Sequence, residues 1–147
     1  MNNPAREADA FNAVGWFHAR LGNHDQGRHA CERALTLARQ HHHRECEADT
    51  LDSLGYIAYH TDRHTEALDY YNQALILYRD NGDTYQEANT LARLGETHAD
   101  LGQYSQARDA WQQALDLYRA QHHTTAADRI QHQLDAQPGG QGAVPAP

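Results

Sequence analysis

Apolar and small residues recur along most of the chain at the spacing i, i+3, i+4, i+7, which is typical of one face of a helix. The three clearest stripes are Phe11, Val14, Gly15, His18; Leu51, Leu54, Gly55, Ala58; and Leu91, Leu94, Gly95, His98. A short polar turn follows each stripe, and a second stripe then begins, for example at Ala67 and Tyr71. The pattern therefore predicts pairs of helices joined by short turns.

These predicted helical hairpins repeat every 40 residues. Residues 10–49, 50–89 and 90–129 align without a gap, and the second and third blocks share 13 identical positions of 40. The identities form columns, among them Gly15, Gly55, Gly95 and Ala34, Ala74, Ala114. Because Gly and Ala lie on facing stripes, we expect the paired backbones to approach closely, with Cys31, Tyr71 and Trp111 filling the space beside them.

The columns resemble the tetratricopeptide repeat (TPR), whose W-x2-L-G-x2-Y and A-x3-F signature is matched best in the third block. The matching residues there are Leu91, Leu94, Gly95, His98, Ala107, Trp111 and Ala114. The period departs from the common 34 residues, and longer helices would absorb the difference. Gly27 stands where Ala is usual and should weaken the first hairpin.

The resemblance implies an all-α fold, a right-handed α-α superhelix (solenoid) of three TPR-like helical hairpins and a C-terminal capping helix. The expected TPR domain covers residues 4–136, with repeats at about 5–44, 45–84 and 85–123 and a capping helix at about 124–136 that starts on Thr124 or Thr125 as its cap. Residues 137–147 are rich in Pro and Gly and are expected to form a disordered tail. The helical stripe at the N-terminus has no capping element before it.

The third block is also similar to the C-terminal repeats of actinobacterial antibiotic-regulatory transcription factors of the AfsR/SARP type. The similarity is carried by residues 94–98 and 110–115. It implies the TPR part, or a stand-alone relative, of a bacterial transcription or signalling regulator. No phosphate-binding loop and no basic recognition helix accompanies it.

Charge and cysteine content narrow the class of protein further. The chain has 12 basic and 20 acidic residues, a net charge of -8, and such a surface repels a phosphate backbone, so direct nucleic-acid binding is not expected. Cys31 and Cys46 are too few for a disulfide framework and favour reduced thiols in the cytoplasm. The sequence has neither a membrane-spanning apolar run nor a signal-peptide pattern at its start, so no membrane partner is expected.

Function is expected on the concave face that the first helices of successive hairpins would line. The candidate groove residues share that helix face: Asn12, Trp16, Arg20, Asp52, Tyr56, Tyr59, His60, Arg93, Glu96 and Asp100. Trp16 and Tyr56 are equivalent in the repeat, and their rings could stack on a peptide, or they could pack against the neighbouring hairpin. Aromatic and acidic residues together favour a basic or apolar protein or extended peptide as the partner.

Two further hypotheses stay open beside this scaffold function. The first helix could pair with a second copy of the chain in a homo-oligomer, or the groove could sense a small peptide signal. Histidines 41–43 lie near Cys46 and could contact zinc or nickel, but their spacing matches no zinc motif and a solvated loop explains them, so no metal site or cofactor is predicted. No catalytic motif is found, and the chain is not expected to be an enzyme.

Overall fold

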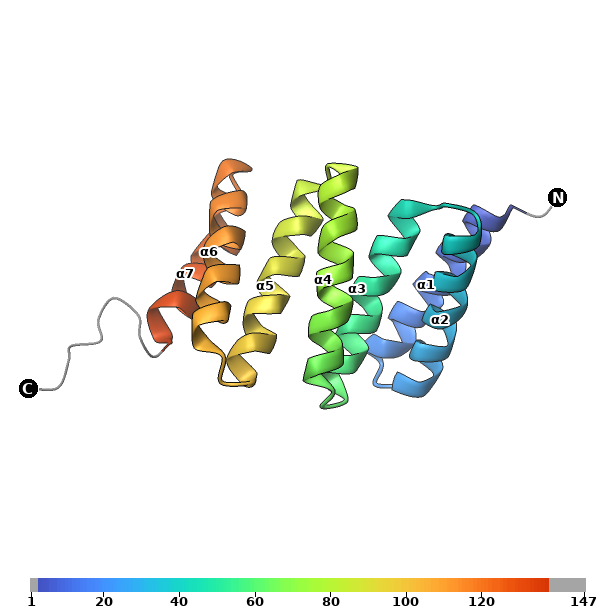
Figure 1. Cartoon of the computed structure of the whole chain (residues 1–147), viewed down its shortest axis with the longest axis horizontal. Helices are drawn as coiled ribbons and strands as arrows, with labels where there is room; N and C mark the ends of the chain where they lie inside the picture. The colour runs from blue at the N-terminus through green and yellow to red at the C-terminus, as the bar shows by residue number, and fades with distance from the viewer. Residues whose placement is uncertain (1–2, 138–147) are drawn as a thin grey trace, which may run out of the picture. The chain divides into compact units, whose positions relative to one another are not determined.

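The computed structural model describes residues 3–137, and within this range every regular element is an α-helix (Figure 1). The seven helices of this range are α1 (Pro4–Arg20), α2 (His24–Gln40), α3 (Arg44–His60), α4 (His64–Asn81), α5 (Thr84–Asp100), α6 (Tyr104–Ala120) and α7 (Thr124–Ala136). The predicted all-α fold of helical hairpins is confirmed. Residues 138–147 of the expected tail lie outside the described residues.

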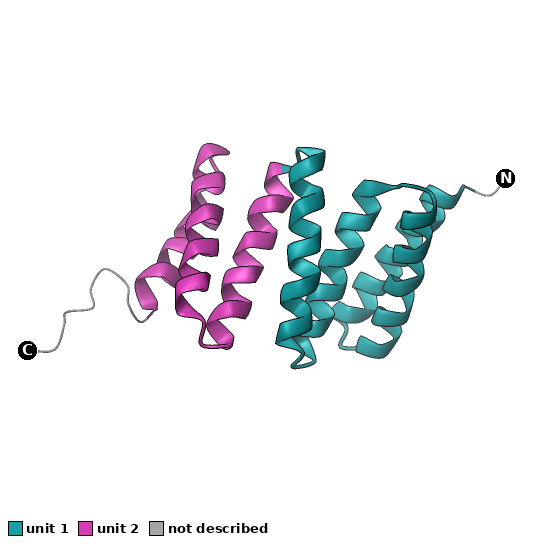
Figure 2. Cartoon of the chain, viewed as in Figure 1, with its two compact units in different colours: residues 1–83 teal, residues 84–147 magenta. Residues whose placement is uncertain are grey.

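The chain divides into two compact units (Figure 2). Unit 1, residues 1–83, contains α1 to α4, and unit 2, residues 84–147, contains α5 to α7. In unit 1, α1 pairs with α2, α3 pairs with α4, and α3 also packs against both α1 and α2. In unit 2, α5 pairs with α6, and α7 packs against α6. None of the described helices is long and apolar enough to cross a bilayer.

The same turn geometry ends each of the first six helices. A residue with positive φ follows the helix, and the next backbone N–H donates a hydrogen bond to a carbonyl of the last helical turn. The residues with positive φ are Gly22, His42, Asp62, Gly82, Gly102 and His122. The returning bonds, such as Asn23 N–H to the His18 carbonyl, are 2.8 to 2.9 Å long. This is the Schellman arrangement, and its recurrence explains how one 40-residue period is kept.

The side-chain cap expected for the C-terminal helix is not formed, whereas α1 has one. Asn3 caps α1 by accepting a 3.3 Å hydrogen bond from the Arg6 N–H, with Pro4 at the first helical position. The expectation that Thr124 or Thr125 caps α7 is wrong. His123 is the N-cap residue, its side chain makes no capping bond, and Thr124 is already helical.

The close approach of paired helices at glycine is confirmed. A methyl group at Gly55 would lie 2.5 Å from Cε1 of Tyr71, which is too close for any real contact. Gly15 and Gly95 have the same relation to Cys31 and Trp111. The side chains that face these glycines, Cys31, Tyr71 and Trp111, belong to residues that are each at most 2% exposed. Gly27 also has a packing reason, since a methyl group there would lie 2.9 Å from the Gly15 carbonyl oxygen.

We predict that Gly55→Ala destabilises the protein by about 1–3 kcal/mol despite the better helix propensity of Ala, because the added methyl group overlaps the Tyr71 ring. Chemical denaturation of the single variant and of Gly55→Ala made in a Tyr71→Ala background measures the effect. In the second background the ring is absent and the methyl group should cost nothing. An equal cost in both backgrounds would contradict this packing argument.

Candidate functional site

In unit 1, aromatic side chains of α1 and α3 form a contiguous cluster. Trp16 and Tyr56 meet edge to face with ring centroids 4.8 Å apart. The Arg20 guanidinium lies 5.6 Å from the Trp16 centroid and 6.0 Å from that of Tyr56, within the range of a cation–π contact. His60 extends the cluster, because its ring centroid lies 4.2 Å from that of Tyr56 and 5.1 Å from that of Tyr59. We call Trp16, Arg20, Tyr56, Tyr59 and His60 the aromatic surface.

Two other candidate groove residues of unit 1 point into the packing between helices. The Asn12 side-chain oxygen accepts a 3.0 Å hydrogen bond from the Ser53 hydroxyl and a weaker one from the Cys31 thiol, at 3.9 Å. Asp52 is buried, with 8% of its surface exposed. The exposed chemistry of this surface is therefore aromatic and cationic, without the Asp52 carboxylate.

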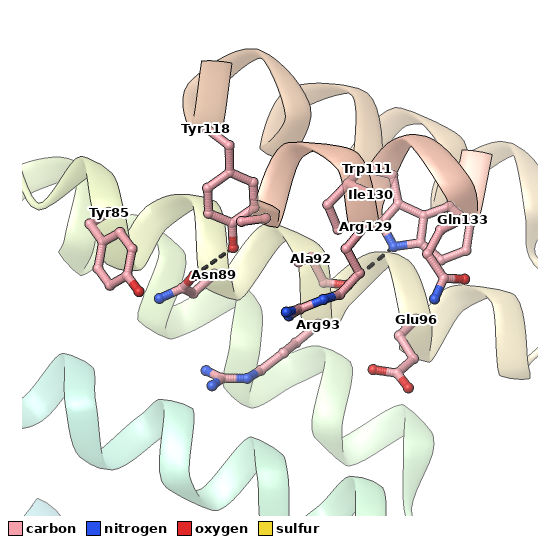
Figure 3. Close-up of a pocket in the computed structure, with 11 residues that line it drawn as sticks. Tyr85, Asn89, Ala92, Arg93, Glu96, Trp111, Tyr118, Arg129, Ile130 and Gln133 are labelled. Carbon is pink, nitrogen blue, oxygen red and sulfur yellow. Dashed lines mark hydrogen bonds between the residues drawn. The ribbon is translucent and has the colours of Figure 1, made fainter. Parts of the chain in front are cut away.

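In unit 2, α5, α6 and α7 enclose a pocket of about 410 Å³ (Figure 3). Trp111 and Tyr118 of α6 contribute aromatic walls, and both are buried. The Trp111 indole N–H donates to the Ala92 carbonyl at 3.3 Å, and the Tyr118 hydroxyl donates to the Asn89 side-chain oxygen at 2.5 Å. These bonds hold the aromatic side chains in place behind α5.

The rim of this pocket carries the charged groups. Arg93 and Glu96 come from α5, Arg129 and Gln133 from α7, and the Arg129 side chain extends toward α5 (Figure 3). Burial raises the pKa of Tyr118 to about 12, while the positive charges of Arg93 and Arg129 act in the opposite direction. Both guanidinium groups therefore act electrostatically on the pocket interior, where they favour a negatively charged group.

The candidate residues of the third repeat are thus divided. Arg93 and Glu96 line the pocket, whereas the exposed Asp100 is not among the residues that line it. Arg129 and Gln133 are not among the site residues predicted from sequence, because the pattern indicates only a capping helix for residues 124–136. The 40-residue register contained the signal, since Arg129 and Gln133 are one period after Asn89 and Arg93.

A hydrogen-bonded pair of a tyrosine and an acidic or amide side chain occurs at equivalent positions of the two units. In unit 1 the Tyr78 hydroxyl donates to Asp49 Oδ1 at 2.6 Å, which is the repeat equivalent of the bond between Tyr118 and Asn89. Burial raises the pKa of Asp49, the Tyr78 bond lowers it, and the negative charges of Asp52, Asp83 and Asp9 raise it. The net shift is upward, so Asp49 ionises less readily than a solvated carboxyl.

Both cysteines are free and buried. Burial is the main cause that raises the pKa of Cys31 to about 12 and that of Cys46 to about 11. Cys46 Sγ lies 3.7 Å from the Thr50 hydroxyl, and His43 Nε2 is hydrogen-bonded to Asp9 Oδ1 at 3.1 Å. Asp9, His43 and Cys46 offer ligand atoms that all lie within 4.8 Å of one another, a proximity that the sequence analysis did not predict.

Comparison with known proteins agrees with the repeat. The tetratricopeptide repeat family model matches residues 6–80 and again residues 47–120. No curated protein is significantly similar to the chain in sequence.

Solved structures show the same fold at low sequence identity. The apo form of RapI has a TM-score of 0.80 and 13% identity over 90% of this chain and 51% of its own. The N-terminal domain of stress-induced protein-1 (STI-1) from C. elegans has a TM-score of 0.70 and 13% identity, covering 89% of this chain and 99% of its own. BtubC from P. vanneervenii has a TM-score of 0.72 and 15% identity, covering 100% and 72%. The chain spans about half the length of RapI.

We predict that Asp49→Asn raises the free energy of unfolding at pH 7, because the folded protein holds the ionised carboxylate less well than water does. The pKa of Asp49 is raised on folding, so its contribution to stability is complete below the ordinary Asp range and is lost as the pH rises through the raised value. The gain from the substitution should therefore shrink as the pH falls.

Denaturant unfolding at several pH values checks this, with Asp109→Asn on the exposed face of α6 as the control. Asn89 already occupies the equivalent position in unit 2, so the amide fits the fold. A loss of stability at pH 7 specific to Asp49→Asn would show that the bond from Tyr78 needs the charge.

Proposed function

Because the chain belongs to the tetratricopeptide repeat family, which indicates a protein-interaction scaffold, we propose that it is a protein- or peptide-binding module without catalytic activity. The observation that carries this proposal is the pocket of unit 2, where two helices present polar and charged side chains above buried aromatic walls. Such a combination of apolar walls and a few convergent polar groups is typical of ligand sites.

The charges of the pocket define the ligand that it fits best. Arg129 can hold a carboxylate through two parallel N–H donors, Arg93 adds a second positive charge at the rim, and Glu96 can accept from a backbone amide or a basic side chain. Gln133 adds a carboxamide group suited to the backbone of an extended peptide. We infer that this pocket binds an extended segment that carries an acidic side chain.

The basic or apolar partner expected from the sequence fits the aromatic surface of unit 1 only in its apolar form. Arg20 already lies over the rings of Trp16 and Tyr56, so a basic side chain would meet a positive charge there. We therefore propose an apolar segment for the aromatic surface and an acidic one for the pocket of unit 2.

We also propose a setting for this binding function. The similarity of residues 94–98 and 110–115 to AfsR/SARP-type repeats supports the TPR part, or a relative, of a bacterial transcription or signalling regulator. A peptide-signal sensor is the form of that role in which the ligand is small. The buried reduced thiols are consistent with a cytoplasmic protein.

Self-association is a second candidate function, and a specific observation favours it. Val14 and Phe17 on α1 are 49% and 64% exposed, and Leu21, which follows as the C-cap residue, is 60% exposed. The repeat equivalents of Val14 and Phe17 are Leu54 and Ile57, which are only 2% and 3% exposed in α3, the helix that packs on α2. Asp25 and Arg33 line one surface hollow together with Val14, and opposite charges on one patch suit a two-fold contact with a second copy.

For peptide binding, we predict that a random-peptide phage library selected on the whole chain yields sequences enriched in Asp and Glu. Arg93→Ala and Arg129→Ala should each weaken a selected synthetic peptide by about tenfold or more, since each loses a charge-assisted pair worth at least about 1.4 kcal/mol. Fluorescence anisotropy measures the affinity. Arg119→Ala, an exposed arginine of α6 outside the pocket, is the matched control.

The same selection distinguishes the two surfaces. Basic or apolar peptides whose binding is lost in the Trp16→Ala, Tyr56→Ala double variant, but kept in Arg129→Ala, would overturn the unit 2 site in favour of the aromatic surface. The triple variant without Arg93, Arg129 and Trp16 tests the function as a whole. If every peptide binds this variant as tightly as it binds the folded wild-type chain, the proposed peptide-binding function is wrong.

For self-association, we predict that the sedimentation coefficient of the wild-type chain rises with concentration and that Phe17→Glu abolishes the rise, because a carboxylate would be buried against the second copy. Ile76→Glu is the matched control, since Ile76 on α4 is 60% exposed and lies in the other hairpin. A wild-type chain that sediments as a monomer at every concentration would rule this candidate out.

A further inference from the structure

The first repeat departs from the other two at the recurring polar pair. Tyr78 and Tyr118 occupy one period-related position, and each donates to the carboxylate or amide opposite, Asp49 or Asn89. The equivalent residue of the first repeat is Ala38, which has no hydroxyl to donate to Asp9. Instead, Asp9 Oδ1 is hydrogen-bonded to His43 Nε2, and Cys46 packs with Ala8 and with Ala38 itself.

This replacement brings three metal-binding groups together from separate segments. Asp9 lies on α1, His43 ends the loop after α2, and Cys46 lies in the first turns of α3. Their ligand atoms are all within 4.8 Å of one another. Tetrahedral Zn²⁺ bonds of about 2.0–2.3 Å require ligand atoms roughly 3–4 Å apart, so small side-chain adjustments would suffice.

The combination occurs where the first repeat meets the second and is not found at the corresponding positions of the later repeats. One period later the three positions are Asp49, Asp83 and Gln86, and two periods later they are Asn89, His123 and Ala126. Neither later set contains a thiol, and the third lacks the carboxylate as well. The cluster is therefore not a general consequence of the hairpin, which builds the same backbone in all three repeats.

We propose that Asp9, His43 and Cys46 form a binding site for one Zn²⁺ ion. An imidazole, a thiolate and a carboxylate together suit zinc, which accepts nitrogen, sulfur and oxygen ligands. The Asp9 side chain is 59% exposed, so the ion can enter from solvent and a water molecule can complete the tetrahedron. The Cys46 thiol gives its proton to solvent as the Zn–S bond forms, which balances the charge of the step.

The bound ion would join α1 to α3 and to the loop between α2 and α3. These segments belong to two successive hairpins of unit 1, and the ion would replace the interaction that the tyrosine provides in the later repeats. Because the folded protein binds the ion and the unfolded chain does not hold the three groups together, zinc should stabilise unit 1.

Titration of the whole chain with Co²⁺ tests the site, because a cobalt–thiolate bond gives a charge-transfer absorption band that imidazole and carboxylate ligands do not give. We expect one equivalent of Co²⁺ to develop the band and Zn²⁺ to displace it. Cys46→Ala should abolish the band, and Ala126 shows that alanine is accepted at the equivalent position. His43→Gln and Asp9→Asn should each weaken Zn²⁺ binding in calorimetry by more than about tenfold. Changing even a residue that only hydrogen-bonds to a metal ligand lowers metal affinity about 10- to 100-fold.

Three control variants make the outcome specific. Cys31→Ala keeps Cys46 and should keep the band, whereas the His41→Gln, His42→Gln double variant removes the neighbouring loop histidines and should bind normally. His123→Gln changes the equivalent histidine of unit 2 and should also have no effect. Circular dichroism confirms that each variant is folded.

The proposal is overturned if the folded wild-type chain gives no cobalt–thiolate band, or if the band survives Cys46→Ala. It is also overturned if Zn²⁺ binding is lost only in the His41→Gln, His42→Gln variant, because the metal would then be held by the loop histidines alone. Peptide binding in unit 2 is measured separately, so neither result depends on the other.

Discussion

The approach of two backbones at a glycine is the constraint on which each hairpin depends. At Gly15, Gly55 and Gly95 there is no room for a methyl group, because Cys31, Tyr71 and Trp111 occupy it. This contact holds the second helix against the first. The two candidate surfaces lie beside it: Trp16 and Tyr56 of the aromatic surface directly follow Gly15 and Gly55, and Trp111, which packs on Gly95, also lines the pocket of unit 2.

A repeated backbone also makes differences between repeats informative. The period-related positions Asp9, Asp49 and Asn89 have the same place on their helices, but their partners differ: a histidine, a buried tyrosine and a tyrosine that walls a pocket. In the first repeat Ala38 stands at the position of the tyrosine, and there Asp9 lies near His43 and Cys46. One structural position thus holds a buried carboxylate with a raised pKa in the second repeat, borders the proposed binding pocket in the third and belongs to the proposed metal site in the first.

The positive charges on both candidate surfaces shape the proposed partners. The chain has a net charge of -8, but the pocket of unit 2 presents Arg93 and Arg129, and Arg20 covers the rings of unit 1. Buried acids such as Asp52 contribute to the net charge without being available to a ligand. Net charge is therefore a poor guide to which peptide this scaffold binds, because recognition depends on the few charges that line each surface.

The sequence by itself determined the helices, the 40-residue period and the close glycine contacts, because these follow from local spacing and from side-chain size. It also identified Trp16, Tyr56 and Arg93 as residues of the first helices. Only the tertiary structure showed that Asn12 and Asp52 point inward, that Arg129 of α7 completes a pocket, and that Asp9 meets His43 and Cys46. Spacing along the chain assigns a residue to a helix face. The direction and neighbours of its side chain depend on packing between segments that can be about 34 residues apart, as Asp9 and His43 are, and no local pattern contains this information.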